Sequence, residues 1–154
     1  MQRHNPILLA LLSLSLFFGV AAAAVEPAQP SATDPFVLVQ GKWGWASGAR
    51  SCQNNPQTLT LSADRTEVKL EFEKPETNGA GKLQKSEVYK ILDARARLLR
   101  TMVVGEPRKD PKGQPLTYDF VFVSDNSYCL HRSDWLKGQC TAPMMVRCPG
   151  SKRP

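Results

Sequence analysis

The chain has 154 residues, with 20 Lys or Arg, 14 Asp or Glu and a formal net charge of +6. About 130 residues remain once an N-terminal export signal is removed, which is the size of one domain and excludes a second. The basic residues are dispersed and form no concentrated stripe. Nucleic acid is therefore not an expected partner, whereas an acidic protein surface is.

Residues 1–24 have the layout of a cleaved signal peptide. Arg3 precedes an apolar run over 7–20, and small residues ending in an A-x-A pattern follow it. This order is typical of a secretory signal cleaved after Ala24. The alternative is an uncleaved anchor, because the apolar stretch approaches the roughly 20 residues that span a bilayer. We expect a periplasmic or secreted protein with no membrane span after cleavage.

The cleavage site is followed by a proline-rich segment, 25–35, with almost no apolar content. Such a composition predicts a disordered lead. The folded domain is expected over 36–149, and the polar residues 150–154 are expected to form a flexible tail.

Short runs of alternating apolar and polar residues dominate the predicted domain, and none has a sustained helical period. In the run 66–73, Val68, Leu70 and Phe72 share one face, whereas the run 116–124 is apolar on both faces and is expected to be central. Turn residues separate the runs. The sequence predicts eight β-strands, at 41–46, 58–62, 66–73, 86–93, 97–105, 116–124, 127–132 and 142–148.

The short connections between these strands predict sequential antiparallel neighbours and hence an up-and-down meander. A flat sheet of eight strands would expose its edges, and closure removes them. We therefore predict an all-β fold, a single small antiparallel β-barrel of about eight strands, in a monomer. A β-sandwich is the alternative.

All four cysteines lie after the predicted cleavage site, where export favours disulfides. A hairpin turn centred between residues 137 and 139 would place Cys129 opposite Cys148. Pairing of the first strand with the last would bring Cys52 near Cys140. We therefore favour the pairs Cys52–Cys140 and Cys129–Cys148 over the two other connectivities.

The segment GKW at 41–43 resembles the G-x-W signature that begins many lipocalin-like barrels. The resemblance covers these residues and the strand count. It implies that Trp43 plugs one barrel end and that a basic side chain near the last strand, here Arg147, packs across it. Small bacterial protease-inhibitor barrels also begin with G-x-W and a cysteine, here Cys52, but their second cysteine comes much sooner than Cys129.

The segment SYCLHRSDW at 127–135 is the densest group of chemically active side chains. His131 and Asp134 could act as a base and its orienting carboxylate, but no nucleophile motif accompanies them, so no catalytic residue is expected. The sequence has no C-x-x-C pair and one histidine after cleavage, so no metal or cofactor is expected. The predicted ligand or partner contacts are Trp45, Tyr118, His131, Arg132 and Trp135.

Two non-enzymatic functions remain open. The first is a lipocalin-like binding protein whose barrel holds a small apolar or amphipathic molecule. The second is an exported inhibitor or interaction module that presents the loop 107–115, or the lead, to a hydrolase such as a protease. The interior discriminates between them, because a barrel completely filled by bulky side chains leaves no room for a ligand. The bulky candidates are Trp43, Phe72, Tyr118, Phe120, Phe122 and Met144.

Overall fold

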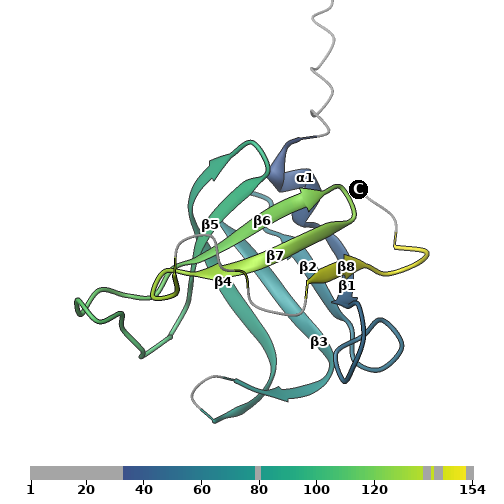
Figure 1. Cartoon of the computed structure of the whole chain (residues 1–154), viewed down its shortest axis with the longest axis horizontal. Coiled ribbons are helices and arrows are strands. Elements are labelled where there is room, and N and C mark those ends of the chain that lie inside the picture. The colour runs from purple at the N-terminus through teal and green to yellow at the C-terminus, as the bar shows by residue number, and fades with distance from the viewer. Residues whose placement is uncertain (1–32, 79–80, 137–139, 141–143, 152–154) are drawn as a thin grey trace, which may run out of the picture.

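The computed structural model describes residues 33–78, 81–136, 140 and 144–151. The predicted signal peptide, most of the predicted lead and the end of the tail lie outside these residues. The described part forms eight antiparallel strands in one closed barrel, paired in chain order and closed by β1 with β8 (Figure 1). The all-β barrel is therefore confirmed, and the sandwich alternative is wrong. The strands are β1 Gly41–Trp45, β2 Gln57–Leu61, β3 Glu67–Thr77, β4 Leu83–Arg95, β5 Leu98–Val103, β6 Tyr118–Ser124, β7 Ser127–Arg132 and β8 Met145–Arg147.

Two strands are longer than the sequence predicts. The β3–β4 hairpin continues beyond a register shift between Glu71 and Glu76 and pairs Thr77 with Leu83. Such an irregularity bends a strand without ending its pairing. The paired ends of β3 and β4 consequently extend beyond the rest of the barrel at the end opposite the helix (Figure 1).

A short helix that the sequence analysis did not predict, α1 Pro35–Val39, precedes the barrel. Asp34 caps it, because its carboxylate accepts a hydrogen bond from the Phe36 amide at 2.9 Å. Pro35 occupies the first turn, where its missing amide costs no helical hydrogen bond. The folded domain thus begins before residue 36, and residues 33–35 of the predicted disordered lead belong to it.

The core follows the strand alternation. The predicted face of Val68, Leu70 and Phe72 is buried in the barrel, as are Tyr118, Phe120 and Phe122 of β6. The second apolar face of β6 points outward, so Val123 is 59% exposed. The expectation that β6 is central fails because a closed barrel has no central strand. Met144, which was expected in the interior, is 40% exposed.

One end of the barrel is sealed by Trp43 and Arg147. These residues face each other across β1 and β8, and the Arg147 guanidinium lies 4.2 Å from the centre of the Trp43 ring. Arg147 also donates to the carbonyl oxygens of Leu38 and Gln40 at 2.9 and 2.7 Å, which holds the end of α1 against the barrel. Gly41 has a φ of +123°, and a Cβ there would lie 2.5 Å from Arg147 Nη1. The glycine of the G-x-W segment is thus required in this chain for steric reasons.

The disulfide prediction is wrong. The bonds are Cys52–Cys148 and Cys129–Cys140. The predicted register assumed a tight turn between β7 and β8, but Ser127 pairs with Val146, a register four residues away. Cys148 therefore lies beside β1, where its amide donates to the Lys42 carbonyl at 2.9 Å. Cys129 instead bonds to Cys140 in the connection that precedes β8.

Within the described residues, no helix is long and apolar enough to cross a membrane. Two disulfides are the usual mark of a protein from an oxidising compartment.

Candidate functional site

The end of the barrel opposite α1 contains a cavity of about 160 Å³. Its floor is built from side chains that the strands direct inward: Leu70, Phe72, Tyr89, Phe120, Tyr128 and Met145. The bulky interior therefore fills most of the barrel but not all of it. A dry cavity of about 150 Å³ is large enough for benzene, whereas drug-sized ligands need roughly 300 Å³ or more.

The polar groups at the bottom of the cavity are satisfied within the protein. Gln57 donates from its side-chain amide to the Tyr128 hydroxyl at 2.7 Å. Burial, the main effect, raises the pKa of Tyr128 above its ordinary value, so this phenol stays neutral. The floor consequently offers a ligand aromatic and aliphatic side chains together with this internally satisfied polar pair.

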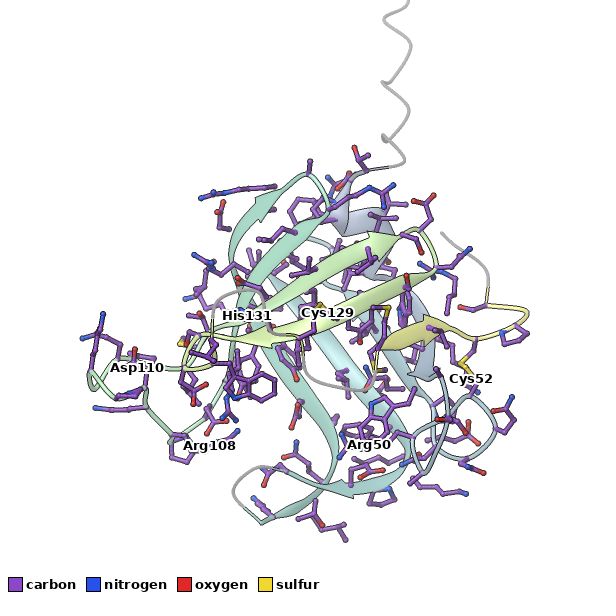
Figure 2. The ribbon with its side chains drawn as sticks, viewed as in Figure 1. Arg50, Cys52, Arg108, Asp110, Cys129 and His131 are labelled. Atoms are coloured by element: carbon purple, nitrogen blue, oxygen red, sulfur yellow. A yellow bond between two sulfur atoms is a disulfide. The ribbon has the colours of Figure 1, made fainter. Side chains whose placement is uncertain are left out.

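Arg50 lies at the rim of this cavity, at the barrel end away from α1 (Figure 2). Its guanidinium is 3.0 Å from a Glu76 carboxylate oxygen and lies 5.2 and 5.5 Å from the ring centres of Trp45 and Phe72. Asn55 donates to the other Glu76 oxygen at 2.6 Å. The charge of Arg50 is therefore matched by Glu76, and aromatic rings cover it.

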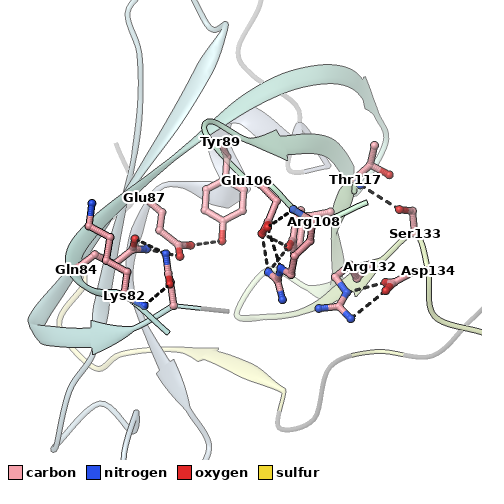
Figure 3. A network of polar contacts seen from close by, with 12 residues as sticks. Lys82, Gln84, Glu87, Tyr89, Glu106, Arg108, Thr117, Arg132, Ser133 and Asp134 are labelled. Atoms are coloured by element: carbon pink, nitrogen blue, oxygen red, sulfur yellow. Dashed lines mark hydrogen bonds and ion pairs between the residues drawn. The ribbon is translucent and has the colours of Figure 1, made fainter. Parts of the chain in front are cut away.

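Glu87 joins this cavity to a second, outer cleft of about 480 Å³. Its carboxylate accepts hydrogen bonds from the Gln84 amide and, at 2.8 Å, from the Tyr89 hydroxyl (Figure 3). Burial and the nearby Glu87 charge raise the pKa of Tyr89 well above its ordinary value. Tyr89 therefore stays protonated at physiological pH and donates a hydrogen bond to Glu87.

The outer cleft is bordered by an ion pair that follows β5. Arg108 Nη2 lies 2.6 Å from Glu106 Oε2, and the Tyr118 hydroxyl donates to the same oxygen at 3.1 Å. The hydrogen bonds from Arg108 lower the pKa of Glu106 to about 2. Burial is the main cause that raises the pKa of Tyr118 to about 12. This cluster fixes the base of the 107–115 loop against the barrel (Figure 3).

The five predicted contact residues do not form one site. Tyr118 lines the outer cleft, and Trp45 stacks with Arg50 at the rim. Arg132 pairs with Asp134 at 2.6 Å and lies 5.0 Å from the ring centre of Trp135. These last two contacts form a local cluster at the end of β7.

His131 and Asp134 do not interact as a base and an orienting carboxylate. Both Asp134 oxygens accept from Arg132, and this hydrogen bonding lowers the pKa of Asp134. His131 faces Asp119 across β6 and β7, and its buried Nε2 has no hydrogen-bond partner in the described structure. Asp119 instead binds Arg100 through both oxygens at 2.8 Å.

The sequence alone did not indicate four residues of this site: Arg50, Glu76, Glu87 and Tyr89. Strand alternation alone places Glu87 and Tyr89 on one face of the run 86–93, so a part of this signal was present. Which face is interior depends on the register, in which Tyr89 pairs with Val68 and Glu87 with Leu70. Arg50 lies in a loop, where no periodicity indicates its position.

In the described residues no group of three or more His, Cys, Asp or Glu side chains is arranged to hold a metal ion. Comparisons of the chain with protein-family models, with curated proteins and with solved structures found no match. The closed eight-strand antiparallel barrel fits a lipocalin-like barrel in its general architecture.

Proposed function

We propose that this chain is an exported, non-enzymatic binding protein of the lipocalin-like type, which holds the apolar end of a small amphipathic molecule. The cavity of about 160 Å³ at the open barrel end carries the proposal. Its floor combines aromatic and aliphatic side chains with the hydrogen-bonded pair Gln57 and Tyr128, and its rim is charged. A ligand can therefore bury a hydrophobic group while its polar end stays at the mouth.

Two further observations support this function. Arg147 packs across Trp43 toward the other end, so in the described part of the chain the cavity is reached from the mouth at Arg50, which suits reversible loading. The signal-like sequence at 1–24 and the two disulfides favour action outside the cytoplasm.

Titration with benzyl alcohol, followed by two-dimensional amide NMR, tests the proposal. We expect saturable shifts at Leu70, Tyr89 and Phe120, because a benzene-sized group matches the cavity. The variant Leu130→Trp adds bulk to the cavity wall and should weaken binding about tenfold or more. Its control is Val123→Trp, at an outward position that is 59% exposed. Equal binding by both variants, or shifts spread over the whole surface, would contradict the proposal.

The projecting loop supports a second candidate, an inhibitor or interaction module that binds a hydrolase such as a protease. Figure 2 shows the loop that carries Arg108 and Asp110 standing away from the barrel. Asp110 Oδ1 braces it by accepting from the amides of Lys112 and Gln114 at 2.9 and 2.8 Å. Such a loop loses little conformational freedom on binding. Stoichiometric inhibition of a secreted protease, lost when 109–114 is replaced by a Gly-Ser linker, would favour this function.

A further inference from the structure

We infer that the ligand is a small organic cation, a primary or substituted amine attached to an apolar group about as large as a benzene ring. This inference rests on the proposed binding function and adds the chemistry of the ligand's polar end. It assigns Glu87 as the residue that recognises the charge.

The position of Glu87 follows from the strand register. Glu87 faces Leu70 directly across β3 and β4, and Leu70 is a buried residue of the barrel interior. Opposed residues on antiparallel strands project to the same side of the sheet. The Glu87 carboxylate therefore points toward the inside of the barrel mouth, and it lines both the cavity and the outer cleft.

The charges around the cavity leave Glu87 unbalanced. The charged residues that line it are Arg50, Glu76 and Glu87, and Arg50 is paired with Glu76. Within the described residues, no Lys, Arg or His forms an ion pair with Glu87, whose two hydrogen-bond donors, Gln84 and Tyr89, are neutral.

The outer cleft adds one more ion pair and one exposed cation. Glu106 is matched by Arg108, and Lys82 is exposed to solvent, which screens its charge. A carboxylate has about four acceptor positions, so Glu87 keeps capacity for an incoming N–H donor. A ligand that carries a positive charge would therefore balance the negative charge of Glu87 at the mouth.

The aromatic floor strengthens the preference for a cation. Tyr89 packs edge-on against Tyr118 and Phe120, with ring centres 6.0 and 5.4 Å apart, and Tyr128 completes the wall. Ring faces attract cations, and this mouth already holds the Arg50 guanidinium near two rings. An anionic ligand would meet the unbalanced Glu87 carboxylate and the negative faces of the rings. An amine with a benzene-sized tail satisfies both the charge and the volume.

Three probes of equal ring size test the inference by NMR titration and calorimetry: benzylamine, benzyl alcohol and benzoate. Benzylamine should bind about tenfold or more tightly than benzyl alcohol, because a charge-assisted hydrogen bond replaces a neutral one, and benzoate should bind most weakly. In Glu87→Gln, benzylamine should lose this advantage while benzyl alcohol changes less than about twofold. Unchanged binding of the neutral probe also shows that the variant is folded. Glu67→Gln, an exposed carboxylate on β3, is the control with the same change in net charge.

The outcomes separate this inference from the proposed function. Equal binding of benzylamine and benzyl alcohol, or an amine preference that survives Glu87→Gln, overturns the inference and leaves the binding function standing. Tightest binding by benzoate assigns an anionic ligand instead. If none of the three probes binds at the cavity, the proposed function itself is wrong and the inference falls with it.

Discussion

Glu106 is a buried carboxylate beside the outer cleft, and its contacts favour the ionised form. Its side chain is 8% exposed and is bound by Arg108 and Tyr118. These contacts stabilise the ionised carboxylate, which is why its pKa falls from 4.5 to about 2. A carboxyl group with a depressed pKa stabilises the fold at pH values above its unfolded pKa. That contribution is lost as the pH falls from about 4.5 through about 2.

We therefore expect Glu106→Gln to lower the free energy of unfolding at pH 7 by an amount on the order of 1–2 kcal/mol. The contribution of the ion pair is limited because Arg108 is 36% exposed and water screens its charge. The difference between the variant and the parent should shrink toward pH 2. Urea unfolding at both pH values measures it, with Glu67→Gln as the control. A difference that stays constant between pH 7 and pH 2 would rule out this linkage.

At the scale of single residues, the packing of Arg147 across Trp43 is what the resemblance of the segment 41–43 to lipocalin-like barrels implies. Trp43 belongs to a recognisable segment, and Arg147 was the candidate to pack across it, which is where the structure places it. Glu87 was missed because its role depends on what it faces. The same glutamate on an outward position would be an ordinary solvated residue, and the choice between the two is made by pairing with Leu70.

The two disulfides constrain segments of very different length. Cys52–Cys148 joins residues 96 apart in the chain, whereas Cys129–Cys140 joins residues 11 apart. In the loop-entropy model, the longer closed loop restricts the unfolded chain more strongly. The first bond should therefore contribute more to stability.

We expect Cys52→Ser with Cys148→Ser to cost about 5 kcal/mol, and Cys129→Ser with Cys140→Ser about 3 kcal/mol. Each double variant places one serine at a buried position, Cys148 or Cys129, so the comparison is matched. Guanidinium unfolding of both variants measures the order. Peptide mapping without reduction checks the connectivity first. The opposite order of stabilities would show that local packing, and not loop closure, dominates.

At the scale of elements, all eight strands could be predicted, most clearly β2 and β3, whose residues alternate between buried and exposed. Their ends and registers could not, since these depend on irregularities that leave weak sequence signals. The shift between Glu71 and Glu76 lengthens the β3–β4 hairpin and helps to build the cavity rim. The four-residue error in the β7–β8 register was enough to exchange the disulfide partners.

For the molecule as a whole, the two barrel ends should differ in local stability. The sealed end combines α1, Trp43 and Arg147 with buried contacts. The β3–β4 extension, residues 73–77 and 83–86, is mostly exposed. Its β4 part is not paired with β5, because that pairing begins at Tyr89. Regions with few buried contacts open more readily than the core.

Hydrogen exchange followed by mass spectrometry should show this gradient. We expect amides in 73–77 and 83–86 to exchange at least about tenfold faster than those of β2 and β6. Benzylamine at saturating concentration should slow exchange near Glu87 more than at the sealed end, if the ligand inference is correct. Uniform protection along β3 and β4 would contradict the predicted gradient.

The bond between Cys52 and Cys148 also decides how the molecule responds to force. A load applied between the two ends of the chain passes directly across this disulfide, so the 96-residue span between the two cysteines is bypassed. At about 3.4 Å per residue, roughly 330 Å of contour length is withheld from extension. In its oxidised form, most of the barrel is thus a mechanically shielded ring, while β1 and the flanking chain remain under tension.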